Sequence, residues 1–500
     1  MATPLRQRIK YFLSAGIGLS AALAQGCVSI PPNEPAPLPS PASFSLDKSV
    51  ATALSSKDFK SGDWPQNDWW RLFGDAQLDR LVDEALAGNP DIRIAAARVH
   101  LAEQAAAAVH AGNLARVGAD TSVTREHFSE HWIVPPPFGG SSSTEGQISL
   151  NAGYDLDLWN RNASLYQARL GEAKAAAATQ AETRLVIGAA LARAYFQWQG
   201  RLARLDVAHE ALAQRHALAQ LVKRRADAGL ETLVAVKQSD ADVAREEAGV
   251  AALERTADVD KRAIAALVGR GPDTAETIVA PTSHFDGSFP VPEILPMDLL
   301  ARRPDVTAQS WRVAAAARAI GAAKAGFYPN IDIAAALGLQ SLELKDLFKS
   351  GSKFSTYGPA LHLPIFEGGR LRANLGAAYA EYDVAVEEYH RALVTAAREV
   401  ADRLAAVRSL AREQERQTQA LQDSEAAYRL ARLRYEKGIT DYLTVLQVKR
   451  DVLRQRDVNM QLAEARLQAV LELIKALGGG YRAADAPAPR TTDREQATHG

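Results

Sequence analysis

The chain is poor in several features that usually identify a protein class. Among its 500 residues there is one cysteine, aromatic residues make up 7%, and the formal net charge is −1. A single cysteine excludes an intrachain disulfide and a cysteine-based metal site. The near-zero charge argues against a nucleic-acid partner. Since no nucleophile motif, zinc signature or phosphate loop is present, we expect no catalytic residues, metal or cofactor.

The first 26 residues have the composition of an export signal. A basic start is followed by a short apolar run over 11–23, too short to span a membrane as a helix. Gly26-Cys27 at its end resembles the processing site of bacterial lipoproteins. This resemblance implies removal of 1–26 and a covalent lipid on Cys27, and Val28 favours the outer membrane as destination. The alternative is a simple cleavage site with a free thiol nearby.

Proline-rich sequence follows, and a polar tail ends the chain. The prolines between 31 and 44 predict that 27–62 forms an extended tether from the lipidated cysteine. The composition of 481–500 predicts a disordered tail.

Two long proline-free blocks dominate the rest of the chain. The first predicts a helix from Ala163 to about Ala228, a break at Gly229, and a helix to about Val268. The second predicts a helix over 370–433, which would be roughly 95 Å long at 1.5 Å per residue, and another from Tyr442 to about Leu477. Apolar residues recur at spacings of three and four along 371–407, as in a coiled coil.

The two blocks belong to halves that match in sequence. Asn89-Pro90-Asp91 aligns with Arg303-Pro304-Asp305 at an offset of 214, and Gly229 aligns with Gly438 at an offset of 209. These matches predict an internal duplication. We expect a first repeat at 63–275, a linker of the equatorial region at 276–300, and a second repeat at 301–480.

Each half also contains two segments that alternate like strands, at about 117–128, 147–158, 331–342 and 356–366. In 147–158, Asn151, Asp155 and Asp157 share the polar face. One interpretation is a small soluble sheet with one wet face. However, the segments are close to the 9–11 residues that cross a bilayer at a tilt, and aromatic residues stand near their ends, as in interface girdles.

A sheet in lipid cannot leave an edge open, and four strands are too few to close, because the smallest known barrels have eight. If these strands span a membrane, several chains must share one barrel. The polar face with Asn151, Asp155 and Asp157 would then line a water-filled lumen.

Several stretches between about 64 and 480 together form one pattern, and they occur in this order: Trp69–Leu78, Asn89–Asp91, Tyr154–Trp159, Arg302–Asp305 with Ile320–Ala325, Leu363–Arg370 and Tyr435–Arg450. Through these stretches the chain resembles the TolC-type outer-membrane efflux proteins, in their lipoprotein (NodT-like) branch.

The resemblance implies a mainly α protein with a small membrane β part. Three chains would form a homotrimer in outer-membrane lipid, each giving four strands to a twelve-stranded barrel, with the long helices forming a periplasmic α-barrel. The assembly would be a passive exit duct for small molecules, connected through a periplasmic adaptor to an inner-membrane pump.

In this family the periplasmic tip is a closed iris lined by the last helical hairpin, often with an acidic ring. Here the matching positions are Thr444 and Gln447, while Arg450 remains basic. We therefore expect a neutral constriction near Leu443, Thr444 and Gln447, with Arg450 bonded to a neighbouring hairpin. Arg450 could instead be a solvated helix residue.

Two other classes stay open on the residues alone. A periplasmic adaptor also carries a helical hairpin, but it would need a β-rich half that is not visible. A coiled-coil scaffold lipoprotein without a pore would leave the four alternating segments unexplained.

Overall fold

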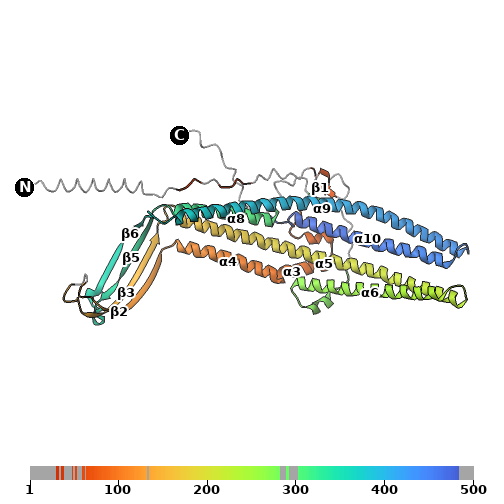
Figure 1. Cartoon of the computed structure of the whole chain (residues 1–500), viewed down its shortest axis with the longest axis horizontal. Coiled ribbons are helices and arrows are strands. Elements are labelled where there is room, and N and C mark those ends of the chain that lie inside the picture. Colours follow the sequence, from red (N-terminus) through yellow and green to blue (C-terminus); the bar gives the residue numbers. More distant parts are fainter. Residues whose placement is uncertain are drawn as a thin grey trace, which may run out of the picture.

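The protein is elongated, with a small sheet at one end and the tips of two helical hairpins at the other (Figure 1). The structure is a computed structural model, and it describes residues 30–32, 35–38, 48, 51–52, 59–61, 64–131, 135–281, 289–291 and 302–483. Within these ranges, no helix has an apolar stretch long enough to cross a membrane. The expected signal peptide, Cys27, most of the tether and of the 276–300 linker, and the tail beyond 483 lie outside the described residues.

Four helices form the two hairpins, and their bounds agree with the sequence predictions to within a few residues. They are α5 (Arg161–Asp227), α6 (Leu233–Val268), α9 (Arg370–Glu436) and α10 (Tyr442–Ala476). Each hairpin turns at a glycine with positive φ, 74° at Gly229 and 71° at Gly438, which only glycine adopts without strain.

Shorter elements precede each hairpin or gather at mid-length. Prolines open two helices, α4 (Pro90–Gly112) and α8 (Pro304–Ala325), at the position where a missing N–H costs nothing. The remaining elements are η2 (Trp69–Phe73), α3 (Ala76–Gly88), η3 (Pro272–Thr277), η4 (Leu344–Asp346), η5 (Ser350–Ser352) and a parallel pair, β1 (Phe59–Ser61) with β4 (Phe289–Val291).

The sheet has four antiparallel strands in the order β2-β3-β5-β6. Their bounds are β2 (Arg116–His127), β3 (Ser142–Asp155), β5 (Asn330–Ser341) and β6 (Lys353–His362).

Two of these strands differ clearly from the predicted bounds. β3 begins before 147 and ends before 158, because Asp157 has a φ of 41° and turns the chain out of the ladder. β6 ends at His362, before Pro364, which has no N–H to donate to a ladder.

Residues that face each other across the strands lie on the same side of a sheet, so the pairing register separates two faces. One face is apolar, and its side chains are mostly exposed. Its members include Val117, Ala119, Val123, Ile148, Leu150, Tyr154, Ile333, Leu337, Tyr357 and Leu361. The opposite face is mostly polar or small, with Phe354 as an exception. It includes Asp120, Gln147, Ser149, Asn151, Asp155, Asp332, Gln340 and Thr356.

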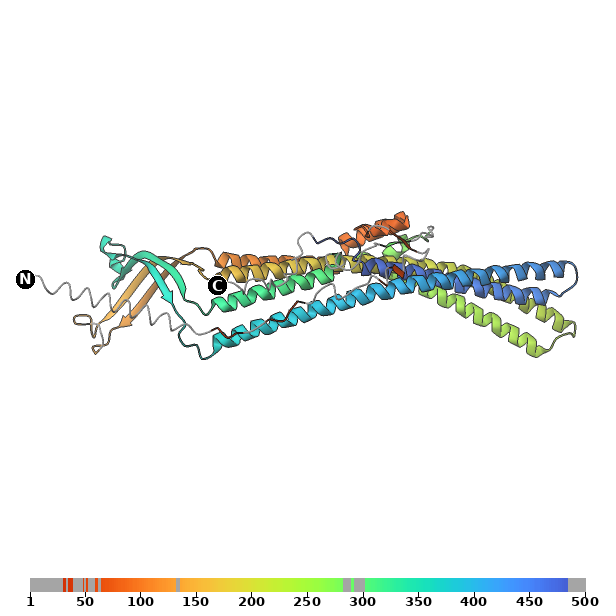
Figure 2. The ribbon, with the colours of Figure 1, turned by 90° about the horizontal axis from the view of Figure 1, so that it is seen from above.

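The helices next to the sheet repeat its lateral order. α4 packs on α5, α5 on α8, and α8 on α9, so α4 and α9 form the two lateral edges of this part of the molecule (Figure 2). Each of these helices continues into, or from, one strand of the sheet in the same order. The sheet and the helical layer therefore have corresponding open edges, β2 with α4 and β6 with α9.

Candidate functional site

Asp157 caps a helix and is not a strand residue, which corrects the expectation that it lies on the polar strand face. Its Oδ1 accepts a hydrogen bond from the backbone N–H of Asn162 at 2.9 Å, and its Oδ2 from that of Ala163 at 2.8 Å. These N–H groups belong to the first turn of α5, where no intrahelical acceptor exists. The Asn160 side chain, at the formal N-cap position, makes no capping bond.

The capping geometry predicts the effect of removing this carboxylate. We expect Asp157→Ala to lower the free energy of unfolding by about 1 kcal/mol, because two N–H groups lose their acceptor. Asp157→Asn, which keeps one acceptor oxygen, should lose less. Chemical denaturation of the detergent-solubilised protein measures both, and equal stability of Asp157→Ala and the unchanged protein would contradict the cap.

Asn151 and Asp155 do lie on the polar face of β3, and both meet amide groups. Asn151 Nδ2 donates to Asp120 Oδ2 at 2.5 Å and to Ser149 Oγ at 3.2 Å. Asp155 Oδ2 accepts from Asn162 Nδ2 at 2.9 Å and from Asn330 Nδ2 at 3.4 Å. The carboxylates here are oriented by neutral groups.

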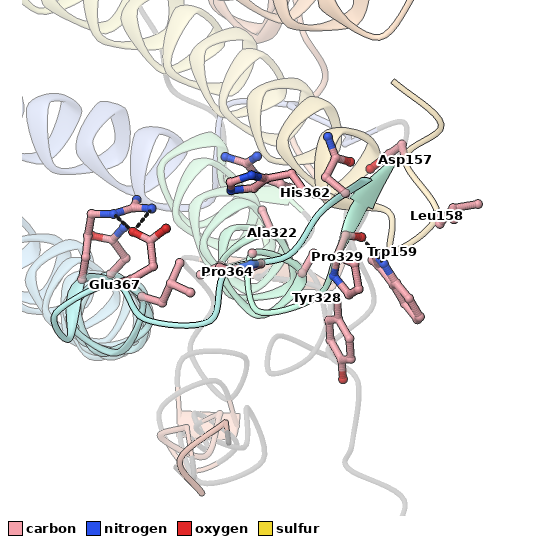
Figure 3. Close-up of a pocket in the computed structure, with 17 residues that line it drawn as sticks. Asp157, Leu158, Trp159, Ala322, Tyr328, Pro329, His362, Pro364 and Glu367 are labelled. Atoms are coloured by element: carbon pink, nitrogen blue, oxygen red, sulfur yellow. Dashed lines mark hydrogen bonds and ion pairs between the residues drawn. The ribbon is translucent and has the colours of Figure 1, made fainter. Parts of the chain in front are cut away.

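A cavity of about 220 Å³ lies where the sheet meets the helices (Figure 3). On its wall, Trp159 stacks on Tyr328 with ring centroids 4.6 Å apart, and Trp159 Nε1 donates to the carbonyl oxygen of Pro329 at 2.8 Å. Glu367 forms an ion pair with Arg370 at 2.7 Å on another wall. The stacked aromatic pair thus marks the plane where strands give way to helices.

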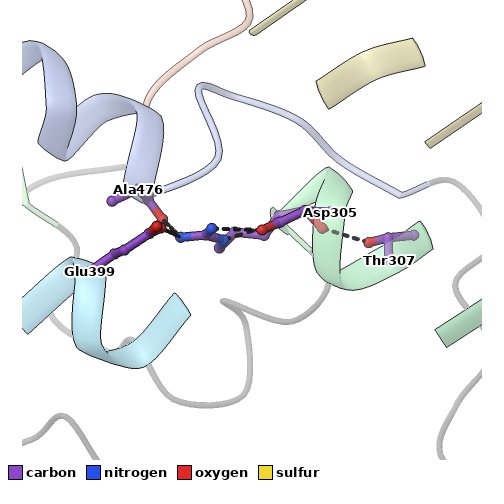
Figure 4. A network of polar contacts seen from close by, with 5 residues as sticks. Asp305, Thr307, Glu399 and Ala476 are labelled. Carbon is purple, nitrogen blue, oxygen red and sulfur yellow. Dashed lines mark hydrogen bonds and ion pairs between the residues drawn. The ribbon is translucent and has the colours of Figure 1, made fainter. Parts of the chain in front are cut away.

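Further along the molecule, Arg303 joins the start of α8 to α9 and α10 (Figure 4). Its guanidinium donates to both carboxylate oxygens of Asp305, at 3.0 and 2.7 Å, to Glu399 Oε2 at 2.9 Å and to the carbonyl oxygen of Ala476 at 3.1 Å. The Arg303 side chain is 8% exposed. The same carboxylates, above all Asp305, raise the pKa of Arg303 against the opposing effect of burial.

At the far end, the expected constriction residues occupy the first turns of α10. Leu443 and Thr444 are half-buried, and Gln447 and Arg450 are exposed. The Arg450 guanidinium makes no ion pair within the described part of this chain. Asp441, which the sequence analysis did not single out, caps α10: its Oδ1 accepts from Thr444 N at 2.8 Å and Thr444 Oγ1 at 2.7 Å, and these bonds lower the pKa of Asp441.

Polar contacts attach the N-terminal half of α10 to α5. Glu210 on α5 pairs with Lys449 at 3.1 Å and Arg456 at 3.2 Å. One turn along, the buried Gln214 side chain donates to the carbonyl oxygen of Leu446, next to Gln447. These contacts leave no signal in the sequence, because their partners are more than 230 residues apart.

The described residues contain no group of three or more His, Cys, Asp or Glu side chains that could hold a metal ion. The candidate functional parts of the molecule are two surfaces, the amphipathic sheet with its open edges and the pair of hairpin tips. The long helices separate them.

A family model for outer membrane efflux proteins matches two stretches of the chain, 81–270 and 295–479. The chain belongs to this family. The multidrug resistance outer membrane protein MdtQ of Escherichia coli O157:H7 is 31% identical over 445 residues, which cover 87% of this chain and 91% of MdtQ. The fusaric acid resistance protein FusA of Burkholderia cepacia is 36% identical over 358 residues, covering 71% of this chain and 67% of FusA.

A solved structure agrees in sequence and in fold. The outer membrane protein VceC of Vibrio cholerae is 35% identical, superposes with a TM-score of 0.77, and covers 83% of this chain and 100% of its own. These matches identify the chain as an outer-membrane efflux protein, as its resemblance to the TolC-type family implies, and the interpretations as an adaptor or a coiled-coil scaffold lose their basis.

Proposed function

We propose that the protein is the outer-membrane exit duct of a tripartite efflux system. Three copies form a twelve-stranded barrel continued by a periplasmic α-barrel, and the duct passively conducts small molecules received from an inner-membrane pump through a periplasmic adaptor. The observation that carries this proposal is the four-stranded sheet with an exposed apolar face and two unpaired edges, β2 and β6. Such a sheet is tolerated in lipid only if its edges pair with other copies.

The edges of the helical layer support the same assembly. Apolar side chains are exposed on α4, with Ile94 at 49% and Leu101 at 70%, and on α9, with Val384 at 60% and Val394 at 46%. Since α4 continues into β2 and α9 follows β6, a contact between copies would close the sheet and cover these side chains together.

A cysteine cross-linking scan tests the shared barrel. Val117→Cys on β2 is combined in turn with Tyr357→Cys, Pro359→Cys and Leu361→Cys on β6, which scans the register between copies. We expect at least one pair to give cross-linked species up to a trimer in membranes. Val117→Cys with Ile333→Cys is the matched control, because β5 is enclosed between β3 and β6. Products that stop at a dimer, or remain within one chain, would refute the threefold barrel.

The proposal includes a covalent lipid on Cys27. The tether that follows Cys27 is long enough for this lipid to reach the level of the sheet. Ala36 N donates to Asp383 Oδ1 at 3.0 Å, so the tether lies against α9. Ala36 is nine residues along the chain from Cys27, a stretch that can span about 30 Å when extended. The start of α9 is about 20 Å from Asp383. Cys27 can thus reach the sheet–helix boundary. Metabolic labelling with palmitate should mark the protein and be lost in Cys27→Ser; labelling that persists would exclude this site.

The proposed duct closes at the α10 tip near Leu443, Thr444 and Gln447, where Arg450 bonds a hairpin of the neighbouring copy. Arg450 is exposed and has no ion pair within the described part of its own chain, which leaves it available for such a contact. Arg450→Ala should raise the open probability of single channels in lipid bilayers. Arg454→Ala, one turn away and paired with Asp451, is the control. An unchanged open probability in Arg450→Ala would exclude the contact.

A further inference from the structure

The apolar face of the sheet carries two formal charges, and both are positive. The register places Arg125 on β2 opposite Thr144, and Lys353 on β6 opposite Leu339. Every aspartate and glutamate of the four strands belongs to the opposite face. Both cations lie near the strand ends farthest from the helices, whereas the helix end of the apolar face is uncharged (Figure 1).

The charges of Arg125 and Lys353 are not compensated within the chain. Both residues are exposed, and neither forms an ion pair in the part of the chain that the structure describes. The two lysines of the adjacent β5–β6 loop differ in this respect, because Lys345 and Lys349 are both paired with carboxylates of that loop. A cation that faces lipid is costly near the bilayer midplane and much less so toward the headgroups. The two positions therefore fit the headgroup level of one leaflet.

Assembly would bring the two kinds of cation together, because they lie on the two edge strands. Within one chain β3 and β5 separate them, so they are three strand spacings apart, about 14 Å across the sheet. In a closed barrel, β2 of one copy pairs with β6 of the next. The lateral separation between Arg125 of one copy and Lys353 of the next then falls to one spacing, about 5 Å.

The registers of the cross-linking scan specify how close the two cations come. Arg125 lies eight residues beyond Val117 toward the loops, and Lys353 lies eight residues beyond Leu361. A register that pairs Val117 with Leu361 would therefore make the two cations direct neighbours. A register shifted by two residues would leave their Cα atoms about 8 Å apart, which two long side chains can still bridge through a common partner.

This seam between copies requires a negative partner, since like charges directly opposite each other destabilise a sheet. Neither the apolar face nor lipid tails supply one. With the helices on the periplasmic side, as proposed, the loop ends of the strands reach the outer leaflet. In a bacterial outer membrane this leaflet consists of glycolipids whose sugar headgroups carry phosphates. A phosphate accepts charge-assisted hydrogen bonds from arginine and lysine, so one phosphate can bind both cations at once.

We propose that the seam between neighbouring copies binds a phosphate group of an outer-leaflet glycolipid, held by Arg125 of one copy and Lys353 of the next. The inference rests on the proposed function, because the two side chains meet only in the closed barrel. The site would occur three times in the trimer, and each bound lipid would join two copies. At the opposite boundary the stacked pair of Trp159 and Tyr328 takes the place of cations.

Native mass spectrometry of the detergent-solubilised assembly, titrated with lipid A as the phosphorylated glycolipid, tests the site. We expect binding that saturates at three molecules per trimer. A lysine or arginine near an anionic lipid is worth about fivefold in affinity. Arg125→Gln combined with Lys353→Gln should therefore weaken binding about thirtyfold, and each single substitution about fivefold. The single variants carry the test should the double variant not assemble. Arg125→Lys combined with Lys353→Arg keeps both charges and should retain the affinity.

Controls separate the phosphate contact from general attraction to lipid. Arg116→Gln removes a cation from the same strand but from the polar face, and it should leave the affinity for lipid A unchanged. Lipid A from which a phosphatase has removed the phosphates should bind the unchanged protein and the double variant alike. Inorganic phosphate at millimolar concentration should not displace lipid A, because it lacks the acyl chains.

The possible failures are distinguishable. Equal affinity of the unchanged protein and the double variant for lipid A would overturn the inference while leaving the exit duct intact. Undiminished binding of the phosphate-free lipid, or displacement of lipid A by inorganic phosphate, would do the same. Failure of the unchanged protein to form trimers would instead refute the proposed function, and the site with it.

Discussion

Replacing Arg303 by methionine should lower the free energy of unfolding by about 3–5 kcal/mol, the usual cost of removing one partner from a buried ion pair. Methionine keeps much of the arginine's volume, so the loss is mainly electrostatic. Asp305 would lose two hydrogen bonds, and Glu399 and the Ala476 carbonyl one each. Arg303→Lys should recover only part of the loss, because an ammonium cannot make the bidentate contact. Denaturant titration of the detergent-solubilised protein measures both.

The neighbouring arginine provides the control. Arg302 lies over the ring of Trp64, with 4.9 Å between its guanidinium carbon and the ring centroid, a contact worth about 0.5–1 kcal/mol at an exposed site. Arg302→Met should therefore be mild. If Arg303→Met were as mild as Arg302→Met, the network in Figure 4 would not hold the three helices together.

The long helices were predictable because they depend on local signals. Gly229 and Gly438 mark the two turns, and apolar spacing of three and four residues specifies the seam of α9. Such signals lie within one or two helical turns, so they are readable without knowing what packs against what.

Arg303 shows what the sequence could not reveal. The Arg303-Pro304-Asp305 stretch is visible as a motif, but Glu399 and Ala476 are 96 and 173 residues away. Nothing local in the sequence indicates that these groups meet. The role of the motif as a junction of three helices required the tertiary structure.

The three glycines after α10 are likewise explained only by tertiary contacts. They predict a helix end, and the structure adds a reason for each. A Cβ at Gly478 would lie 1.8 Å from the carbonyl oxygen of Arg302, and one at Gly479 would lie 2.1 Å from the Leu185 side chain. One at Gly480 would lie 2.1 Å from the backbone of Gln66. Close approach by three separate segments leaves no sequence signal beyond the glycines themselves.

Asp157 illustrates how a correct pattern can misplace one residue. Alternation over 147–158 predicts the face of every polar residue, and Asn151 and Asp155 do lie on that face. The pattern continues by coincidence into Asp157, because a capping carboxylate two residues past a strand has the same parity as a strand residue. Only the backbone, with its φ of 41°, distinguishes the two roles.

The strongest test of the membrane assignment is a charge on the apolar face of β3. Leu150 lies between Ala119 on β2 and Leu337 on β5, in the interior of the sheet, and its side chain is 49% exposed. In water, an arginine at such a half-exposed position would cost little. If the face meets lipid near the bilayer midplane, Leu150→Arg should lower the free energy of unfolding by about 2–4 kcal/mol. Urea titration of the protein folded in lipid vesicles measures this loss.

Asn151, the residue next to Leu150, provides a control for the effect of the arginine side chain itself. Asn151→Arg places the same side chain on the polar face of the same strand, next to Asp120. In the proposed barrel, water in the lumen would solvate this arginine and a carboxylate could pair with it. We therefore expect Asn151→Arg to remain close to the unchanged protein in stability while Leu150→Arg does not. Because the two positions are adjacent, they share the strand and nearly the same depth, and the main difference is the face of the sheet. Equal tolerance of both substitutions would mean that the apolar face meets water or protein, and the shared barrel would have to be abandoned.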